Sequence, residues 1–264
     1  MKTSITYSNK RFLDRFLRTG AALLFWGCVW AAAAYFVDKE VLLPTPFAVG
    51  RVMVSLFAET SFWFSIFGSL VRVLIGYIAG CAVGIILAAF CFRFRLINTM
   101  FSPVLSVIRA VPVASFIILA LVWIGRDRVP SFSAFLMVLP IVTGNILTGL
   151  RSVDRELWEV AKLYRFDFLK KFRLLYIPAA LPHFTSAART SLGMAWKAGI
   201  AAEVLCSLSF SIGGYIYESK VYLETPALFA WTITVILISM LIEGLLFRLS
   251  VFRIDSHEKT EVAE

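Results

Sequence analysis

The chain has 264 residues, of which 59% are hydrophobic and only 16% are charged. Soluble globular domains usually carry about 25% charged residues, and here the apolar residues fall in long runs, so the composition excludes a soluble domain and indicates a helical membrane protein with several spans. The net charge of +9 would suggest nucleic acid as the partner of a soluble protein, but in a membrane protein it reflects the basic residues of cytoplasmic loops, so no nucleic-acid partner is expected.

Six apolar stretches are close to the roughly 20 residues that a helix needs to cross a bilayer. In chain order they cover residues 19–37, 73–92, 101–124, 129–150, 183–206 and 225–247. The third is interrupted by Arg109, the fifth carries Arg189, Lys197 and Glu203, and the sixth has Glu243 near its end. The sequence therefore predicts an all-α membrane protein with six transmembrane helices.

The distribution of basic residues predicts the orientation of these spans. If the N-terminus is cytoplasmic, the inside segments hold 17 basic residues and the outside segments hold five, a bias that places both termini in the cytoplasm. The expected organisation is a cytoplasmic segment 1–18, a transmembrane permease domain 19–250 and a cytoplasmic tail 251–264. Alanines 31–33 resemble a signal-peptide cleavage site, but the apolar stretch around them is long for a signal peptide.

Glycine and proline mark the first half of the domain. Two prolines within residues 43–46 impose an extended entry and then permit a short interfacial helix over residues 47–57. Gly76, Gly80 and Gly84 recur every four residues in the second span, which predicts a flat stripe for close helix packing or, as the alternative, a role in the solute pathway.

Prolines also lie inside later spans. Pro103 and Pro112 fall in the third and Pro140 in the fourth, where each frees a backbone carbonyl and kinks the helix. Kinked helices of this kind indicate either a moving, pathway-lining element or a static packing role.

The segment between the fourth and fifth spans, residues 151–182, is too polar to cross the membrane and too long for a turn. Four apolar residues within it recur at i, i+3, i+4 and i+7, on one face of a short helix: Leu157, Val160, Ala161 and Tyr164. Asp154 is the expected N-cap of this helix, and Asp167 is the expected N-cap of a second one. Such amphipathic helices lie on a lipid surface or dock on a protein.

Several motifs in this loop and elsewhere resemble one known family. Residues 159–161 (Glu-Val-Ala), followed by residues 177–182 (IPAALP), resemble the EAA loop of ABC importer permeases. Five further segments resemble the nitrate/sulfonate/taurine subgroup of that family: residues 43–46, 69–77, 109–112, 196–203 and 213–215. The resemblance covers roughly residues 40–250 in the order of the family.

The resemblance implies a type I (MetI-like) importer permease fold with six transmembrane helices and a cytoplasmic coupling helix, in the bacterial cytoplasmic membrane. It implies ABC ATPase subunits, an extracytoplasmic solute-binding protein and membrane lipid as partners, and no catalysis by the chain itself. A homodimer is expected, because two ATPases need two coupling loops and this chain has one. The implied solutes are small anions such as nitrate, sulfonates or taurine, although related permeases carry bicarbonate and pyrimidine or vitamin precursors.

In this family the coupling loop sits in a cleft of the ATPase, and closure of two ATPases around ATP moves the spans. The resemblance assigns the ATPase contact to seven residues: Glu156, Leu157, Glu159, Val160, Ala161, Tyr164 and Arg165. Arg165 departs from the family pattern, which has glycine at this position. Because glycine tolerates positive φ between two helices and arginine does so poorly, the sequence predicts a reshaped turn or a salt bridge from Arg165 to the partner.

Ionisable residues inside a membrane are costly, which favours a functional interpretation. The candidate pathway residues are four: Arg109, Pro112, Lys197 and Glu203. Arg109 or Lys197 could attract an anionic solute, whereas the alternative for all the charged residues is a structural ion pair or snorkelling to the interface. Arg72 and Glu243 are expected near span ends, at the interface.

The sequence carries no signature of catalysis or of a bound cofactor. It lacks a GxxxxGK[ST] phosphate loop and a GxSxG nucleophile elbow, and its four cysteines form no CxxC pair. We therefore expect no metal, no cofactor and no ATP hydrolysis by this chain. A self-contained secondary transporter or channel is the alternative function, but it leaves the loop 151–182 without a role.

Overall fold

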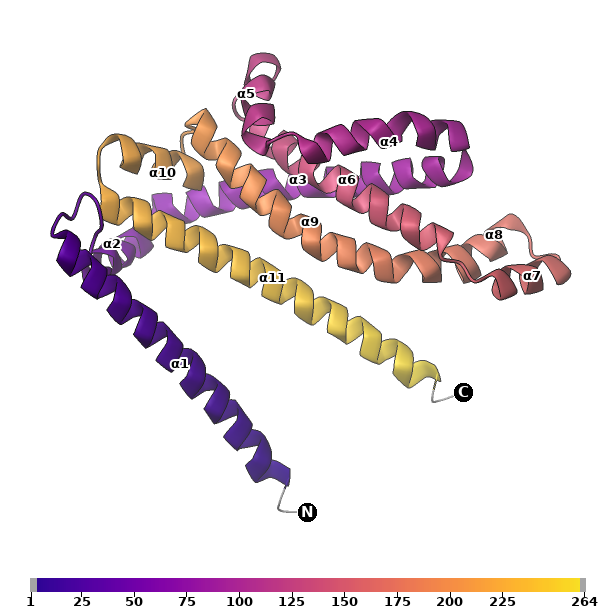
Figure 1. Cartoon of the computed structure of the whole chain (residues 1–264), viewed down its shortest axis with the longest axis horizontal. Helices are drawn as coiled ribbons and strands as arrows, with labels where there is room; N and C mark the ends of the chain where they lie inside the picture. The colour runs from indigo at the N-terminus through magenta and orange to yellow at the C-terminus, as the bar shows by residue number, and fades with distance from the viewer. Residues whose placement is uncertain (1–3, 262–264) are drawn as a thin grey trace.

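The computed structural model describes residues 4–261, which form helices joined by short connections, with no strand among them (Figure 1). In chain order the elements are α1 (Ser4–Val37), α2 (Pro46–Ala58), α3 (Thr60–Arg93), α4 (Arg95–Ala110), α5 (Val113–Trp123), α6 (Val129–Arg151), α7 (Arg155–Leu163), α8 (Phe168–Lys171), the π-helical segment η1 (Phe172–Tyr176), α9 (Ile177–Cys206), α10 (Ile212–Val221) and α11 (Thr225–Glu261). The all-α fold class is confirmed.

Four helices are long and apolar enough to cross a membrane. They are the Arg18–Val37 part of α1, the whole of α3 and α6, and the Thr225–Leu245 part of α11. A fifth span is obtained if α4 and α5, which are bent by 107° at their junction, count as one. Helix α9 has 30 residues but carries Arg189, Lys197 and Glu203, and it is not among these spans. The chain is thus a multi-pass membrane protein.

The predicted bounds of the second and third spans are wrong. Helix α3 begins at Thr60 rather than at residue 73, because Arg72 lies inside the helix bundle and does not end the span. The third predicted span is broken, because Val111 adopts the extended conformation that a following proline favours and Pro112 then starts α5 in a new direction.

Other bounds also differ from the sequence prediction. The fourth span is confirmed as α6. Helix α9 already begins at Ile177, directly after η1, so the polar loop ends before residue 182. Helix α11 continues to Glu261, so residues 251–261 of the predicted tail are helical, while residues 262–264 lie outside the described part.

The glycine stripe of α3 packs against α6. A Cβ on Gly80 would lie 2.7 Å from the Cβ of Val138, and one on Gly84 would lie 3.1 Å from the Cβ of Val142. A Cβ on Gly76 would collide with the carbonyl of Ser131. The stripe therefore serves close helix packing, the first of the two predicted roles.

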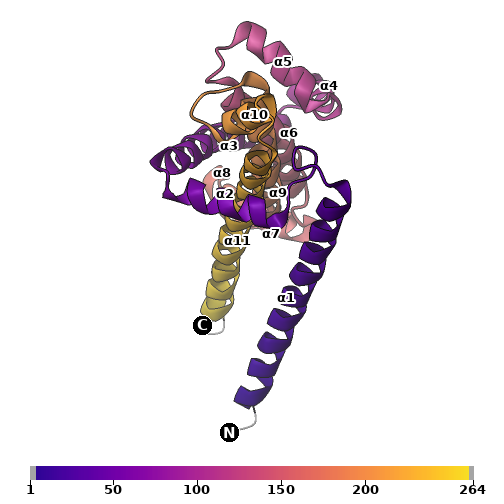
Figure 2. The same ribbon diagram turned by 90° about the vertical axis from the view of Figure 1, so that its left-hand side faces the viewer.

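Helix α9 lies against α6 along much of its length and reaches α11 through a buried tryptophan. The Trp196 side chain is 1% exposed, and its indole N–H donates to the carbonyl of Val235 at 3.2 Å. Helix α1, in contrast, stands apart from the bundle along most of its length (Figure 2). Its Trp30 holds one end in place by donating to the carbonyl of Pro44 at 3.0 Å and stacking on Phe229.

Candidate functional site

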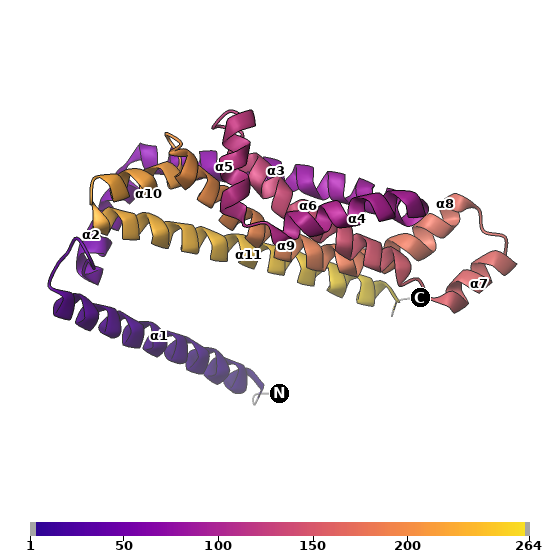
Figure 3. The same cartoon turned by 45° about the horizontal axis from the view of Figure 1, so that its top comes forward.

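Helices α7 and α8 project from one end of the bundle, beyond the ends of α6 and α9 (Figure 3). Both predicted N-caps are confirmed. The Asp154 carboxylate accepts a hydrogen bond from the N–H of Glu156 at 2.9 Å, and the Asp167 carboxylate accepts one from the N–H of Lys170 at 2.9 Å. An exposed ion pair between Arg155 and Glu159, 3.1 Å apart, adds a small i,i+4 stabilisation to α7. Local hydrogen bonds from capping residues therefore define where both helices begin.

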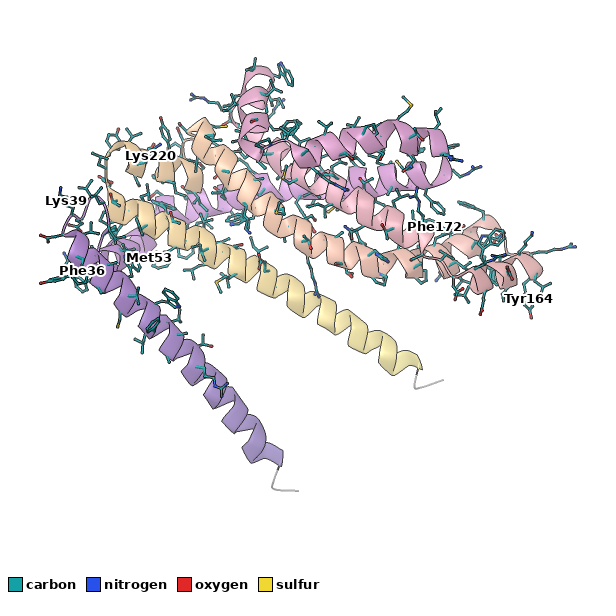
Figure 4. All side chains as sticks on the ribbon, viewed as in Figure 1. Phe36, Lys39, Met53, Tyr164, Phe172 and Lys220 are labelled. Atoms are coloured by element: carbon teal, nitrogen blue, oxygen red, sulfur yellow. The ribbon has the colours of Figure 1, made fainter. Side chains whose placement is uncertain are left out.

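The apolar residues of α7 divide between the loop interior and the surface. Leu157, Val160, Leu163 and Tyr164 are between 47% and 80% exposed, whereas Ala161 is 1% exposed. Tyr164 lies at the outer end of the molecule, and Phe172 lies nearer the bundle (Figure 4). Four neighbouring apolar side chains on a helix that projects beyond the ends of the spans mark a surface for lipid or for a partner protein.

We call Leu157, Val160, Leu163 and Tyr164 the apolar face of α7. It differs from the predicted stripe by one residue, because Ala161 supports the loop from inside and Leu163 takes a place on the surface. Leu163 lies three residues after Val160, so the helical period already placed it near this face. Three further residues of the predicted contact set are exposed beside it: Glu156, Glu159 and Arg165.

Arg165 ends α7 in a left-handed conformation, with φ of 51°. Its N–H donates to the carbonyl of Lys162 at 3.1 Å, and the N–H of Phe166 donates to the carbonyl of Ala161 at 2.9 Å. These two bonds form a Schellman motif, in which glycine is usual at the position of Arg165. The prediction of a reshaped turn is therefore wrong: the turn is kept, and arginine bears the steric cost of about 1 to 2 kcal/mol.

A second polar centre lies inside the bundle, around Glu203 of α9. This carboxylate is completely buried and forms an ion pair with Arg72 of α3, with Nε and Oε1 3.0 Å apart. The hydroxyl of Ser69 donates to its other oxygen at 2.7 Å, and the N–H of Gly213 donates to the same oxygen at 3.2 Å. Glu203 is thus the structural ion pair that the sequence left open as an alternative to a pathway residue.

The same cluster caps the start of α10. The first three N–H groups of α10 would otherwise lack acceptors. Those of Ile212, Gly213 and Gly214 donate to Ser69, Glu203 and Ser211, at 3.1, 3.2 and 2.9 Å. A negative charge at this position also suits the positive end of the helix dipole. The cluster therefore joins α3, α9 and α10 at one buried point.

Arg72 is a residue whose position the sequence prediction got wrong. The sequence predicts a position near a span end, whereas Arg72 lies inside α3, which runs from Thr60 to Arg93. The available signal was the uncharged segment before it, residues 60–71, which extends the span upstream by a further three turns. Its partner could not be identified from spacing, because Glu203 lies 131 residues later in the chain.

Arg109, near the end of α4, lies against α6. Its guanidinium Nη2 donates to the backbone carbonyl of Pro140 at 2.6 Å, which ties α4 to α6. Arg109 also lines a polar recess of 330 Å³ together with Gly144, Asn145 and Thr148 of α6. The recess combines a cation with amide and hydroxyl groups, which is a suitable lining for a small anion.

The candidate pathway residues do not converge on one site. Pro112 is the N-cap of α5 at the sharp bend, and Lys197 is an exposed residue of α9 that does not line the recess around Arg109. Glu203 is enclosed in the ion-pair cluster. Among the described residues, no group of three His, Cys, Asp or Glu side chains is placed to hold a metal ion.

This chain matches one known protein family and is similar to several known proteins. The family described as the binding-protein-dependent transport system inner membrane component matches residues 80–254. A putative aliphatic sulfonates transport permease protein of Bacillus subtilis is 29% identical, over 74% of this chain and 70% of its own length. A bicarbonate transport system permease protein of Synechococcus elongatus and a nitrate import permease protein of Leptolyngbya laminosa are each 28% identical, over 60% of this chain and 57% and 56% of their own lengths.

Proposed function

The chain belongs to the family of binding-protein-dependent transport system inner membrane components, and from this premise we propose that it couples solute import to a separate ATPase through α7. It is a permease subunit of an ABC importer, a membrane protein that provides the solute pathway. ATP hydrolysis is assigned to a partner chain, because members of this family are permease subunits.

The observation that carries the coupling proposal is the exposed apolar face of α7. An amphipathic helix that presents apolar side chains at i, i+3 and i+7 fits a groove on a partner protein. The face lies at the end of the bundle, where a soluble subunit has free access (Figure 3). Burying one such side chain stabilises a complex by about 1.5 to 3 kcal/mol, so four of them can anchor an ATPase. The neighbouring acidic residues Glu156 and Glu159 are assigned to the polar rim of this contact.

The six-span topology is supported by two further elements. Helices α4 and α5 together supply one bent span, and α9, whose buried Glu203 is neutralised by Arg72, supplies another. The basic residues of the α3–α4 junction and of α7 to η1 gather at one end of the bundle, which we assign to the cytoplasm. Helices α1 and α11 both lead from the opposite end toward this one, so both termini are assigned to the cytoplasm (Figure 1).

The assembly is assigned as a homodimer bound to two ATPases in the bacterial cytoplasmic membrane. Each chain offers one α7 face, and a pair of nucleotide-driven subunits needs two. An extracytoplasmic solute-binding protein delivers the solute to the opposite end, where α2 and α10 lie. Lipid covers the remaining apolar surface of the spans.

The transported solute is assigned as a small anion such as a sulfonate, taurine or nitrate. The names of the relatives support this class. Within the chain, the recess lined by Arg109 supplies the positive charge for an anion, and the exposed Lys197 adds a second cation to α9. We do not assign Glu203 to the pathway, because its carboxylate is fully used by Arg72 and Gly213.

The test is reconstitution of the permease with its ATPase and binding protein in vesicles. Co-purification of the ATPase, together with uptake that requires ATP and survives the collapse of ion gradients, is the expected result. Uptake by the isolated permease, driven by an ion gradient, would instead identify the self-contained secondary transporter. The family membership already disfavours that alternative.

A further inference from the structure

An apolar pocket of 610 Å³ lies between the end of α3 and the helices α7 and α8. Its volume is in the range of about 300 to 1,000 Å³ that ligand sites occupy. Seven of its twelve lining residues are aromatic and none is acidic. The proposed function does not use this pocket, because the apolar face of α7 points elsewhere.

Two cations line this apolar pocket, Arg93 at the last position of α3 and Lys171 at the last position of α8. Neither has an ion-pair partner among residues 18–245, the part of the chain whose side chains the structure describes, where the ion pairs are Arg72–Glu203 and Arg155–Glu159. The Arg93 guanidinium lies over the ring of Phe94, with 5.2 Å from its central carbon to the ring centroid. Two unneutralised cations beside an apolar surface call for a ligand with an anionic head and an apolar body.

The position of the pocket indicates where such a ligand comes from. Ile86 and Phe90 belong to the apolar part of α3, a helix that crosses the membrane, while Arg93 ends that helix. The pocket therefore spans the border between hydrocarbon and water. Aromatic side chains are typical of this border, and basic pockets at the cytoplasmic edge bind anionic lipid headgroups.

We propose that this pocket is a binding site for an anionic diacyl phospholipid, whose phosphate is held by Arg93 and Lys171 and whose acyl chains lie along Phe90 and Phe172. Trp158 of α7 also lines the pocket, so a bound lipid holds α7 against the end of α3. This site is separate from the apolar face of α7, because Trp158 is two residues before Val160 and points about 160° away from it around the helix.

Trp158 provides a reporter in the chain itself. The full permease is placed in two kinds of phosphatidylcholine nanodisc. One contains a minor fraction of phosphatidylglycerol with brominated acyl chains, and the other contains the same fraction of phosphatidylcholine with brominated acyl chains. Bromine quenches a tryptophan that it touches, and Trp158→Phe identifies the share of Trp158 among the seven tryptophans. We expect phosphatidylglycerol to be preferred at Trp158 by about 25-fold, roughly fivefold for each cation.

The charge requirement is tested with the double variant Arg93→Gln, Lys171→Gln, which should remove the preference. The matched control is Arg51→Gln, Lys220→Gln, on α2 and α10 at the opposite end of the bundle, which should keep the preference (Figure 1). High salt should weaken the preference of the unmodified chain, so the result does not depend on a variant that folds poorly. Equal quenching by both lipids, or a preference that survives in the double variant, overturns the proposal. Loss of quenching when the ATPase binds assigns the pocket to that protein instead and also overturns it.

Discussion

The Glu203 cluster and the apolar face of α7 differ in whether their side chains find partners within the chain. In the cluster, a buried carboxylate finds an arginine, a hydroxyl and a backbone N–H within the same chain. On α7, four apolar side chains find no cover within the described residues and remain at the surface. One region is satisfied within the single chain, whereas the other leaves its apolar side chains exposed.

Because of this difference, mutations in the two regions should have different consequences. A change in the cluster should destabilise the chain itself, because a buried group loses its partner. A change on the apolar face should leave the chain folded and affect only its complex with the ATPase.

Replacement of Glu203 by alanine should cost about 3 to 5 kcal/mol of stability, because Arg72 is left as a buried charge without a partner. The melting temperature of the purified permease in detergent measures the effect. Glu203→Gln is the matched control: it keeps an acceptor for Ser69 and Gly213 and should lose less. A Glu203→Ala variant as stable as the unmodified chain would show that the cluster is not structural.

Replacement of Leu163 by aspartate should weaken ATPase binding by about 2 to 3 kcal/mol, or roughly 30- to 150-fold, because a charge replaces an apolar side chain that the partner buries. The affinity of the ATPase for permease in nanodiscs measures it, and the melting temperature of the permease alone should hardly change. Lys162→Gln, on the opposite side of α7, is the control and should bind normally. Normal transport by Leu163→Asp would remove this residue from the coupling surface.

Replacement of Gly80 by alanine should cost about 2 kcal/mol, because the new Cβ would lie 2.7 Å from the Cβ of Val138 and force α3 away from α6. Gly50→Ala on α2 is the control, since no atom lies within 4 Å of the new methyl group, and it should be neutral or stabilising. Thermal unfolding of the two variants side by side measures the difference. Equal stability would mean that α3 and α6 are less closely packed than the structure shows.

Replacement of Arg165 by glycine should stabilise the chain by up to about 1 kcal/mol, because glycine adopts a φ of 51° without strain. Arg165→Ala should bring no gain, since alanine keeps the steric cost. Thermal unfolding measures stability, and uptake in vesicles measures coupling. If Arg165→Gly is more stable but transports poorly, the guanidinium contacts the ATPase; if it is less stable, the strain argument is wrong.

Much of the coupling loop could be predicted from sequence because its structure depends on neighbours in the chain. The caps at Asp154 and Asp167 are local hydrogen bonds, and the period of α7 follows from residues three and four apart. The burial of Ala161 and the exposure of Leu163 could not be predicted, because they depend on how the loop folds back on itself.

The interior was predicted less well, because its main contacts join residues far apart in the chain. Nothing near Arg72 in sequence indicates Glu203, and the two meet only when α3 and α9 pack together. The ion pair between them could therefore not be predicted from the sequence. The bend of 107° between α4 and α5 is an intermediate case, since Pro112 predicted a kink but not its size.

By itself, the sequence determined the membrane class, most of the spans, the glycine stripe and the polar loop with its capped helices. These features follow from hydrophobicity and from hydrogen bonds between close neighbours. Only the tertiary structure decided that Glu203 is a structural ion pair, that Arg165 keeps a left-handed turn and that the apolar face of α7 is left uncovered. Each of these depends on which distant groups meet, because burial and pairing are properties of the packed chain.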